Sequence, residues 1–440
     1  WANWISLVTL VPMEAVAAVQ YMSSWPWSWA NWTKNFIKNG DITFKGIGVV
    51  FIFMLIFTMI NFWSVKIMTH FTNLISIFKI LLPTLTIVTL ICSGFHEHNF
   101  GTNIHEFMPY GSRSIFEATS VSGIIMSYDA FQTIINMGGE LKNPRKNIVR
   151  GVLISMLITA AIYIMLQVTF IGAVEPSMLA KVGWHGIDFT SPFADLAILM
   201  GINWLVILLY LDAFVSPFGT GVAFVATASR ALAAMTHTRH LPKWLGRINQ
   251  KYMIPRYAMA TDLILAVILV SLFRNWNLLA TVITASTLIA YLTGPVTVMT
   301  LRKIRPDLAR PFKPRYMPWL APIAFVLTSL AIYWSMWPTT IQVILVIALG
   351  LPIYFYYEIR YQHSDLKKQL HNCWWMIGYL IFMSFMSYIG SNGFGGQNWI
   401  KYPFDFVVII VVSLLFYYWG VKSGRDQLDP YAEHIVQNKK

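Results

Sequence analysis

The sequence has few charged side chains and only two cysteines among its 440 residues. Charged residues make up 12% of the chain, about half the share that is usual in soluble domains, which excludes a soluble globular protein. Cys92 and Cys373 stand in different apolar segments, so the cysteines indicate neither a disulfide framework nor a metal site. The net charge of +13 does not indicate nucleic-acid binding, because Lys and Arg occur in short segments between apolar runs.

Apolar sequence is what the chain has in abundance, since 56% of its residues are hydrophobic. A run of about 20 apolar residues is long enough for a helix to cross a bilayer. The uncharged run from Tyr316 to Tyr357 is long enough for two such helices, with a break at Trp337-Pro338. The sequence therefore predicts an all-α polytopic membrane protein with twelve spans, at about residues 1–24, 46–65, 73–95, 115–138, 150–173, 199–228, 257–273, 277–301, 317–336, 339–357, 373–390 and 404–421.

The positive charges are divided unevenly between the two sides of the predicted membrane. If the segment 140–150 is cytoplasmic, 24 of the 32 Lys and Arg residues lie on the cytoplasmic side and seven lie outside. Basic residues are enriched in cytoplasmic loops. The sequence therefore predicts a multi-pass protein of the cell (inner or plasma) membrane, with its basic loops and its C-terminus in the cytoplasm.

The remaining basic residue, Lys79, lies within a predicted span. Its ammonium could extend along the helix toward the headgroups near Thr72 and Asn73. Alternatively it stays within the membrane, where desolvation favours the neutral amine, and there gains and loses a proton. Position alone favours neither interpretation.

Three carboxylates also stand out within predicted spans. Glu14 is flanked by a proline and small residues, which favours a hydrogen-bonded carboxylate at a tight helix contact. Asp212 precedes the sequence SPFGT, whose proline and glycine either kink the helix for packing or free carbonyls for a site. Asp129 and Gln132 have the D-x-x-Q spacing of a capping box, which favours a helix cap over contact with a substrate.

The span 115–138 is interrupted at Ser127-Tyr128-Asp129 and leads into a polar, basic turn. A charged side chain in mid-membrane costs about 2.5–3.5 kcal/mol on insertion scales. Helix breaks at membrane depth occur where they line a cavity or are buried in protein. A capped second half-helix would present its N-terminal dipole and free amides to that cavity. This stretch is therefore a candidate substrate site.

Three segments resemble, in the same order, motifs of the amino acid–polyamine–organocation superfamily of transporters. SYDAFQ and GGELKNPRKNI, within 127–148, are similar to its broken sixth helix and the following loop. ASRALAAM and HLPKWLGRI, within 228–248, are similar to the end of its eighth helix and an amphipathic loop. LRKIRPDLARPFKP, at 301–314, is similar to the basic loop after the tenth helix. The resemblance covers about residues 1–316, and Ala130 stands where the superfamily has glycine.

This resemblance implies a leucine-transporter-like 5+5 inverted-repeat fold, in which substrate binds where the first and sixth helices are broken. The chain would begin in the third helix, so that the first two helices and the opposite wall of the site would be missing. Residues 1–301 would form the transport core, and residues 302–440 would add a basic loop, four further helices and a short tail. Fourteen helices in total resemble the branch with bacterial aspartate–proton symporters and cationic amino acid permeases.

The resemblance also implies roles for single residues. Lys79 matches a fifth-helix lysine that occupies the place of sodium in proton-coupled members, and Ser216 of the eighth helix would lie near it. The carbonyls of the broken stretch would accept hydrogen bonds from the substrate ammonium, and an aromatic residue would close over the substrate. The broken stretch and the closing aromatic correspond to Ser127, Tyr128, Asp129, Ala130 and Phe131, and candidates for the outer wall are Thr284, Ala285 and Ser286.

The favoured hypothesis is a secondary transporter that imports an amino acid with protons by alternating access. An exchanger without proton coupling is the alternative. A receptor that signals is less favoured, because only 19 residues follow the last span. An enzyme is disfavoured, because all histidines lie in loops or at span ends, and no metal or cofactor is expected. The expected partners are an amino acid, protons and the lipid bilayer. Glu14, Asp129 or Asp212 could face a cationic substrate and Lys79 an acidic one.

Overall fold

The computed structural model describes residues 1–63, 65–121, 123–129, 131–136, 143–187, 189, 191–237, 241–252, 254–307, 310, 313–361 and 366–424. It is 80% helical, which confirms the predicted all-α class. The β-strands are two residues long, and they pair as an antiparallel hairpin. The elements are α1 (Ala2–Ser23), η1 (Ser28–Phe36), β1 (Ile37–Lys38), β2 (Asp41–Ile42), α2 (Phe44–Trp63), α3 (Val65–Ser93), η2 (Glu97–Phe100), α4 (Ile104–Phe107), α5 (Gly111–Val121), α6 (Ile124–Ser127), α7 (Phe131–Asn136), α8 (Pro144–Ala173), α9 (Pro176–Val182), η4 (Trp184–Gly186), α10 (Pro192–Leu199), α11 (Asn203–His237), η5 (Lys243–Gly246), α12 (Arg256–Leu272), α13 (Trp276–Ile304), α14 (Met317–Tyr333), α15 (Thr339–Ala348), α16 (Gly350–Tyr361), α17 (Leu366–Ile389), η6 (Asn392–Phe394) and α18 (Phe404–Lys422).

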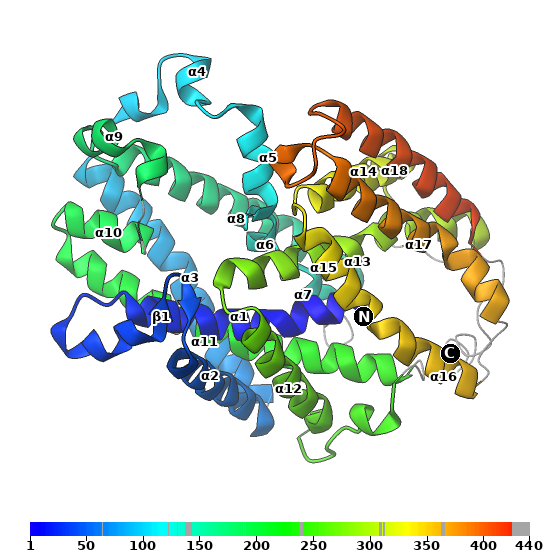
Figure 1. The fold of residues 1–440 in the computed structure, drawn as a ribbon. Helices are drawn as coiled ribbons and strands as arrows, with labels where there is room; N and C mark the ends of the chain where they lie inside the picture. Colours follow the sequence, from blue (N-terminus) through cyan, green and yellow to red (C-terminus); the bar gives the residue numbers. More distant parts are fainter. Residues whose placement is uncertain are drawn as a thin grey trace.

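Helix α1 runs through the middle of the bundle (Figure 1) and is buried along most of its length. It packs mainly against α11 and α13, and also against α2 and α12. A helix that is apolar all round, as α1 is, is at home in a protein core. Ala15 and Ala18 are fully buried, and small side chains let helices approach closely. The small residues that flank Glu14 therefore lie inside the bundle.

Two large groups of buried apolar side chains meet along α13. The first group draws mainly on α1, α2, α11 and α12, and Ile283 of α13 belongs to it. The second draws on α14, α15, α17 and α18, and Leu292 of α13 belongs to it. The helices that come after α13 therefore pack on the rest of the bundle largely through α13, with α5 as a further neighbour of α14, and they lie on one side of the molecule in Figure 1.

Ten of the twelve predicted spans each fall mainly on one helix, and the span 339–357 is divided between α15 and α16. The described residues contain eight helices that are long and apolar enough to cross a membrane. Helices α12 and α14 have 17 residues each, and the predicted span 115–138 is divided among α5, α6 and α7. Helix α11 extends past the end of the predicted span 199–228, to His237, and it continues through Pro217. Membrane helices tolerate proline where neighbouring groups satisfy the freed backbone.

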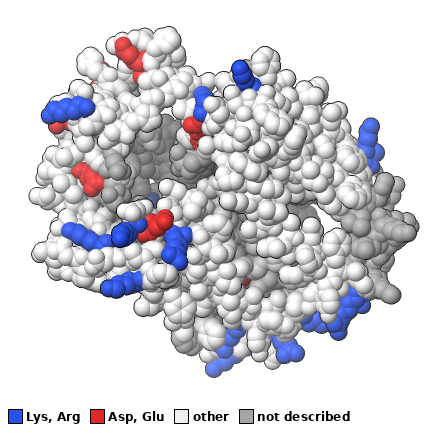
Figure 2. Space-filling model, viewed as in Figure 1, with Lys and Arg blue, Asp and Glu red and all other residues white. Residues whose placement is uncertain are grey.

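The surface is largely apolar between its charged margins. Figure 2 shows Lys, Arg, Asp and Glu mainly around the rim of one face, with broad uncharged areas between them. Leu157 and Ile164 of α8 are among the large apolar side chains that the structure exposes. Such a surface suits contact with lipid. Figure 2 shows a hollow in the same face, beside α5. In Figure 1, α5 lies between two groups of helices.

Candidate functional site

The predicted break in the sixth-helix segment is present. Helix α5 ends at Val121, Gly123 has a left-handed φ of 80°, and the single turn α6 ends at Ser127. Tyr128 and Asp129 form a turn, and α7 begins at Phe131. The break therefore lies where the sequence placed it. Ala130, another predicted site residue, lies outside the described residues.

Ser127 and Tyr128 face Tyr163 of α8. The Tyr163 hydroxyl donates a 3.3 Å hydrogen bond to the Ser127 carbonyl. The rings of Tyr128 and Tyr163 meet edge to face, with centroids 5.6 Å apart. The Ser127 hydroxyl donates to the Ile124 carbonyl at 2.7 Å. One carbonyl of the break is thus already held by a tyrosine hydroxyl, which defines the orientation of the turn.

Asp129 is bound to α13 through both carboxylate oxygens. Thr287 donates to Oδ2 at 2.9 Å and Tyr291 donates to Oδ1 at 3.1 Å. The Thr287 hydroxyl also hydrogen-bonds the Ser6 hydroxyl of α1 at 2.6 Å. Phe131 contacts the Tyr291 ring with a centroid distance of 5.4 Å. The turn is therefore tied to α13 and, through Thr287, to the central helix.

The capping interpretation of Asp129 depends on Ala130 and on the Gln132 side chain, both outside what the structure describes, and it stays a prediction. Thr284, Ala285 and Ser286 of α13 are buried in the bundle. The α13 side chains that reach the broken stretch are instead Thr287 and Tyr291. Thr287 and Tyr291 are four residues apart and therefore share one face of α13, so the sequence alone could have indicated that they act together.

Lys79 of α3 ends on a neighbouring helix. Its ammonium donates a hydrogen bond to the Thr220 hydroxyl of α11. The Thr220 hydroxyl in turn donates to the Ser216 carbonyl at 3.4 Å. The predicted neighbour Ser216 therefore lies one hydrogen bond away, and Thr220, one turn further along α11, makes the contact.

Two carboxylates interact electrostatically with Lys79: Glu14 of α1 and Asp212 of α11. Tyr21 of α1 lies close enough to both acids to interact with them electrostatically. We call Glu14, Lys79 and Asp212 the Lys79 cluster. Oδ1 of Asp212 is buried and has no hydrogen-bond partner among the described residues. Charges removed from water are stable only when they are paired or neutralised, so this cluster is a place where a proton or a cationic group would be stabilised.

A fourth carboxylate within a span, Asp262 of α12, does not stand out from the sequence alone. It is buried and accepts a 2.9 Å hydrogen bond from the Trp4 indole of α1. Its other oxygen, Oδ2, has no hydrogen-bond partner in the described part of the chain. Its position at the α1–α12 contact makes it a structural acid, separate from the broken stretch.

One sizeable cavity can be set aside as a substrate site. A groove of about 660 Å³ lies among α15, α16 and α17, and its lining is almost wholly apolar. A free amino acid carries an ammonium and a carboxylate, and burying unpaired charges is costly. Within the described residues, no three His, Cys, Asp or Glu side chains come together to hold a metal ion.

Comparison with known proteins identifies the family of the chain. The family model described as "Amino acid permease" matches residues 1–344. The chain is 47% identical over 424 residues to the glutamate/serine transporter AimA of Bacillus subtilis (strain 168), covering 96% of this chain and 78% of that protein.

A second relative, the aspartate-proton symporter of the same organism, is 32% identical over 425 residues, covering 96% of this chain and 80% of the symporter. The branched-chain amino acid permease BcaP, also of Bacillus subtilis, is 24% identical over 318 residues, which is 72% of this chain and 65% of BcaP. With its helical fold, its broken span and these matches, the chain belongs to the amino acid permeases of the amino acid–polyamine–organocation superfamily.

Proposed function

We propose that the protein imports an amino acid together with protons across the cell membrane by alternating access. The observation that carries the proposal is the Lys79 cluster, which joins α1, α3 and α11 inside apolar helices. Ionisable residues within membrane spans typically mark ion and proton pathways. Protonation of Lys79 gives the cluster a cation that can pair with the carboxylates of Glu14 and Asp212, and deprotonation removes that cation. A relative that is named an aspartate-proton symporter supports the same coupling ion.

The mechanism assigns separate tasks to the two halves of the site. The broken stretch at Ser127–Asp129 and Phe131 holds the amino acid, with exposed backbone groups directed at its ammonium and carboxylate. The Lys79 cluster holds the proton. Protonated Lys79 donates to helix α11, and its deprotonation weakens the link between α3 and α11 and favours the state that faces the other side.

We assign the transport function to the first part of the chain. Residues 1–301 form the transport core and residues 302–440 a basic loop, four further helices and a tail. The basic loops and the C-terminus face the cytoplasm. The candidate substrates are serine, glutamate and aspartate, because those are the amino acids in the names of two relatives.

The test is uptake by the purified protein in proteoliposomes. Labelled serine, glutamate and aspartate are supplied with an inward proton gradient and again without one, followed by competition with the twenty amino acids. Gradient-driven accumulation is expected for at least one of them. Counterflow without net accumulation would instead identify an exchanger.

Lys79→Ala is expected to abolish accumulation, and Lys45→Ala is the charge-matched control because Lys45 is exposed at the start of α2. Unchanged accumulation in Lys79→Ala would exclude the coupling role. Retained binding of the substrate would show that the variant is folded.

A further inference from the structure

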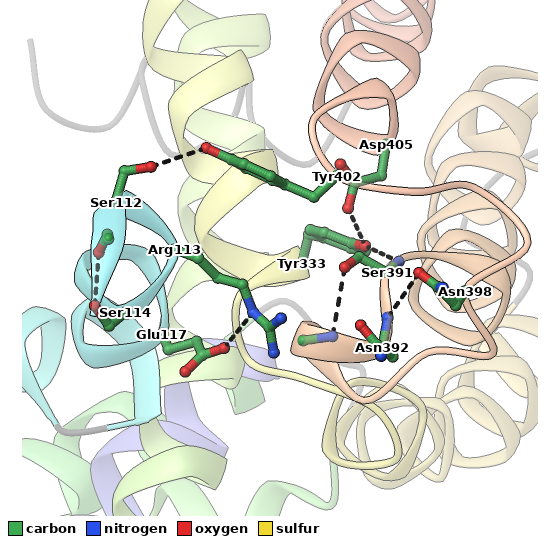
Figure 3. Close-up of polar contacts among 12 residues, drawn as sticks. Ser112, Arg113, Ser114, Glu117, Tyr333, Ser391, Asn392, Asn398, Tyr402 and Asp405 are labelled. Carbon is green, nitrogen blue, oxygen red and sulfur yellow. Dashed lines mark hydrogen bonds and ion pairs between the residues drawn. The ribbon is translucent and has the colours of Figure 1, made fainter. Parts of the chain in front are cut away.

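Helix α5, the segment that leads into the broken stretch, docks on the C-terminal helices. Figure 3 shows Ser112 of α5 beside Tyr402, and their hydroxyls are 3.2 Å apart. The Arg113 guanidinium lies against Gly393, where an added Cβ would collide with it. Phe116 stacks on Trp334 at a centroid distance of 4.8 Å and meets Phe406 at 5.3 Å. We call this set of contacts the α5 clasp.

The C-terminal side of the clasp is a rigid platform, formed by residues 391–406 and the end of α14. The Tyr333 hydroxyl donates to Asp405 Oδ2 at 2.7 Å and accepts from the Ser391 amide at 3.0 Å (Figure 3). Tyr333, Ser391, Phe394 and Asp405 are all buried. A buried polar network whose members are satisfied fixes one conformation. The network therefore favours a single conformation of the platform.

Helix α5 itself lies between two glycines. It begins at Gly111 and is followed by Gly123, which have left-handed φ values of 72° and 80°. Glycine reaches this conformation without steric cost, and hinges are often placed at such positions. A Cβ at Gly111 would meet no atom within 4 Å, so the backbone conformation and not crowding explains the glycine there. Ser112 and Arg113 are exposed.

The position of α5 bears on the site because α5 leads directly into the broken stretch. Only α6, a single turn, separates Gly123 from the turn at Tyr128 and Asp129. Asp129 is in turn fixed to α13 by Thr287 and Tyr291. A movement of α5 on its two glycines would thus change the mouth of the broken stretch while the base of the stretch stays anchored.

We propose that the C-terminal helices provide the stop for α5: the α5 clasp holds α5 in one position and is released and reformed in each transport cycle. The inference rests on the proposed function, since it concerns access to the same site. It gives the four helices beyond the transport core a task in gating.

A reversible crosslink tests the proposal. Cys92 and Cys373, the only cysteines of the chain, are first replaced by serine. Arg113→Cys and Gly393→Cys are then introduced together and joined by a bifunctional thiosulfonate about as long as the arginine side chain that it replaces. Uptake of labelled serine, glutamate and aspartate is measured before crosslinking, after it, and after reduction.

Crosslinking is expected to stop uptake and reduction to restore it. The matched control joins Asn392→Cys to Asn398→Cys, two residues that both lie within the platform and are linked by a 3.5 Å hydrogen bond, and this crosslink is expected to leave uptake unchanged. If the uncrosslinked protein takes up none of the three amino acids, the proposed function fails. If it transports and the Arg113→Cys/Gly393→Cys crosslink has no effect, the gate inference fails alone.

A single substitution gives an independent test without a crosslinker. Gly393→Ala displaces the Arg113 guanidinium, and Phe116→Ala removes the aromatic stack. Each is expected to increase labelling of a Ser127→Cys reporter by a membrane-impermeant maleimide, roughly fivefold for loss of one aromatic pair. Ile115→Ala, which removes an exposed side chain of the same helix, is the control and is expected to leave labelling unchanged. If Gly393→Ala and Phe116→Ala are labelled no faster than the Ile115→Ala control, the inference is overturned.

Discussion

Thr287 of α13 donates a 2.9 Å hydrogen bond to Asp129, across 158 positions of sequence. Together with Tyr291 on the other carboxylate oxygen, it converts a charged side chain at a helix break into an anchor. The broken stretch can then present its backbone to a substrate while its end stays fixed to the bundle. Asp129 is in this view a positioning residue.

Asp129→Asn is expected to slow amino acid uptake, because hydrogen bonds to a charged group contribute about 1.5–3 kcal/mol and neutral ones about 0.5–1.5 kcal/mol. Tyr291→Phe should slow uptake as well, and the double variant should show less than the sum of the two effects. Initial uptake rates and thermal unfolding measure this coupling.

Thr281→Val is the control for the α13 substitutions, because the Thr281 hydroxyl donates only along its own helix, to Asn277. Additive effects of Asp129→Asn and Tyr291→Phe would contradict the anchor. A change in which amino acids compete, seen in Asp129→Asn but not in Tyr291→Phe, would indicate direct contact of Asp129 with the substrate.

Thr220→Val is expected to reduce proton-driven uptake about tenfold, because it removes the hydroxyl that accepts from the Lys79 ammonium, and such bonds contribute about 1.5–3 kcal/mol. The dependence of uptake on external pH should shift as well, since the proton site has lost a partner. The comparison variant is Thr227→Val on the same helix, whose hydroxyl donates to the Ala223 carbonyl at 2.9 Å. Identical pH profiles in the wild type and Thr220→Val would separate Thr220 from the proton site.

The sequence was sufficient to locate the apolar helices and the place of the break. A long apolar run in a bilayer has to form a helix, because its backbone groups have no water to bond. The polar residues 127–129 interrupt one such run, and the structure has a break at this point. The run SPFGT in α11 looked equally disruptive, yet the helix continues through Pro217. What differs is the packing around the two stretches, and this depends on other helices.

Contacts between distant helices are what the sequence could not provide. Thr287, which bonds another helix, and Thr281, which bonds its own, look alike in sequence. For Lys79 the sequence indicated the correct helix and a neighbour, Ser216, but not that Thr220 makes the hydrogen bond, because these two residues are four apart on one face. Only the lateral and axial position of α3 against α11 selects Thr220.

Trp4→Phe is expected to destabilise the protein by about 1–3 kcal/mol, because it leaves a buried carboxyl oxygen of Asp262 without its donor. Substrate affinity should not change, since the pair lies at the α1–α12 contact and not at the break. Trp1→Phe is a matched control: the Trp1 indole nitrogen is buried and has no partner in the described part of the chain. Thermal unfolding and substrate competition measure the two effects. A large loss of affinity in Trp4→Phe at full stability would show that Asp262 belongs to the transport site.

Tyr333→Phe is expected to weaken the platform on which α5 docks. The Tyr333 hydroxyl is the only group in Figure 3 that links α14 to both Ser391 and Asp405. Its removal leaves the fully buried Asp405 Oδ2 short of a donor, at a cost of about 1.5–3 kcal/mol for a bond to a charged group. The unfolding temperature should therefore fall.

Tyr417→Phe is the control for this change, because Tyr417 is a buried tyrosine of the same apolar group and is not a member of the Tyr333 network. In Tyr333→Phe the Ser127→Cys reporter should also be labelled faster at temperatures well below unfolding, since a platform that moves holds α5 less firmly. If stability falls while labelling stays at the wild-type rate, the Tyr333 network supports the fold alone, and the stop for α5 must reside in the Phe116–Trp334 stack and the Arg113–Gly393 contact.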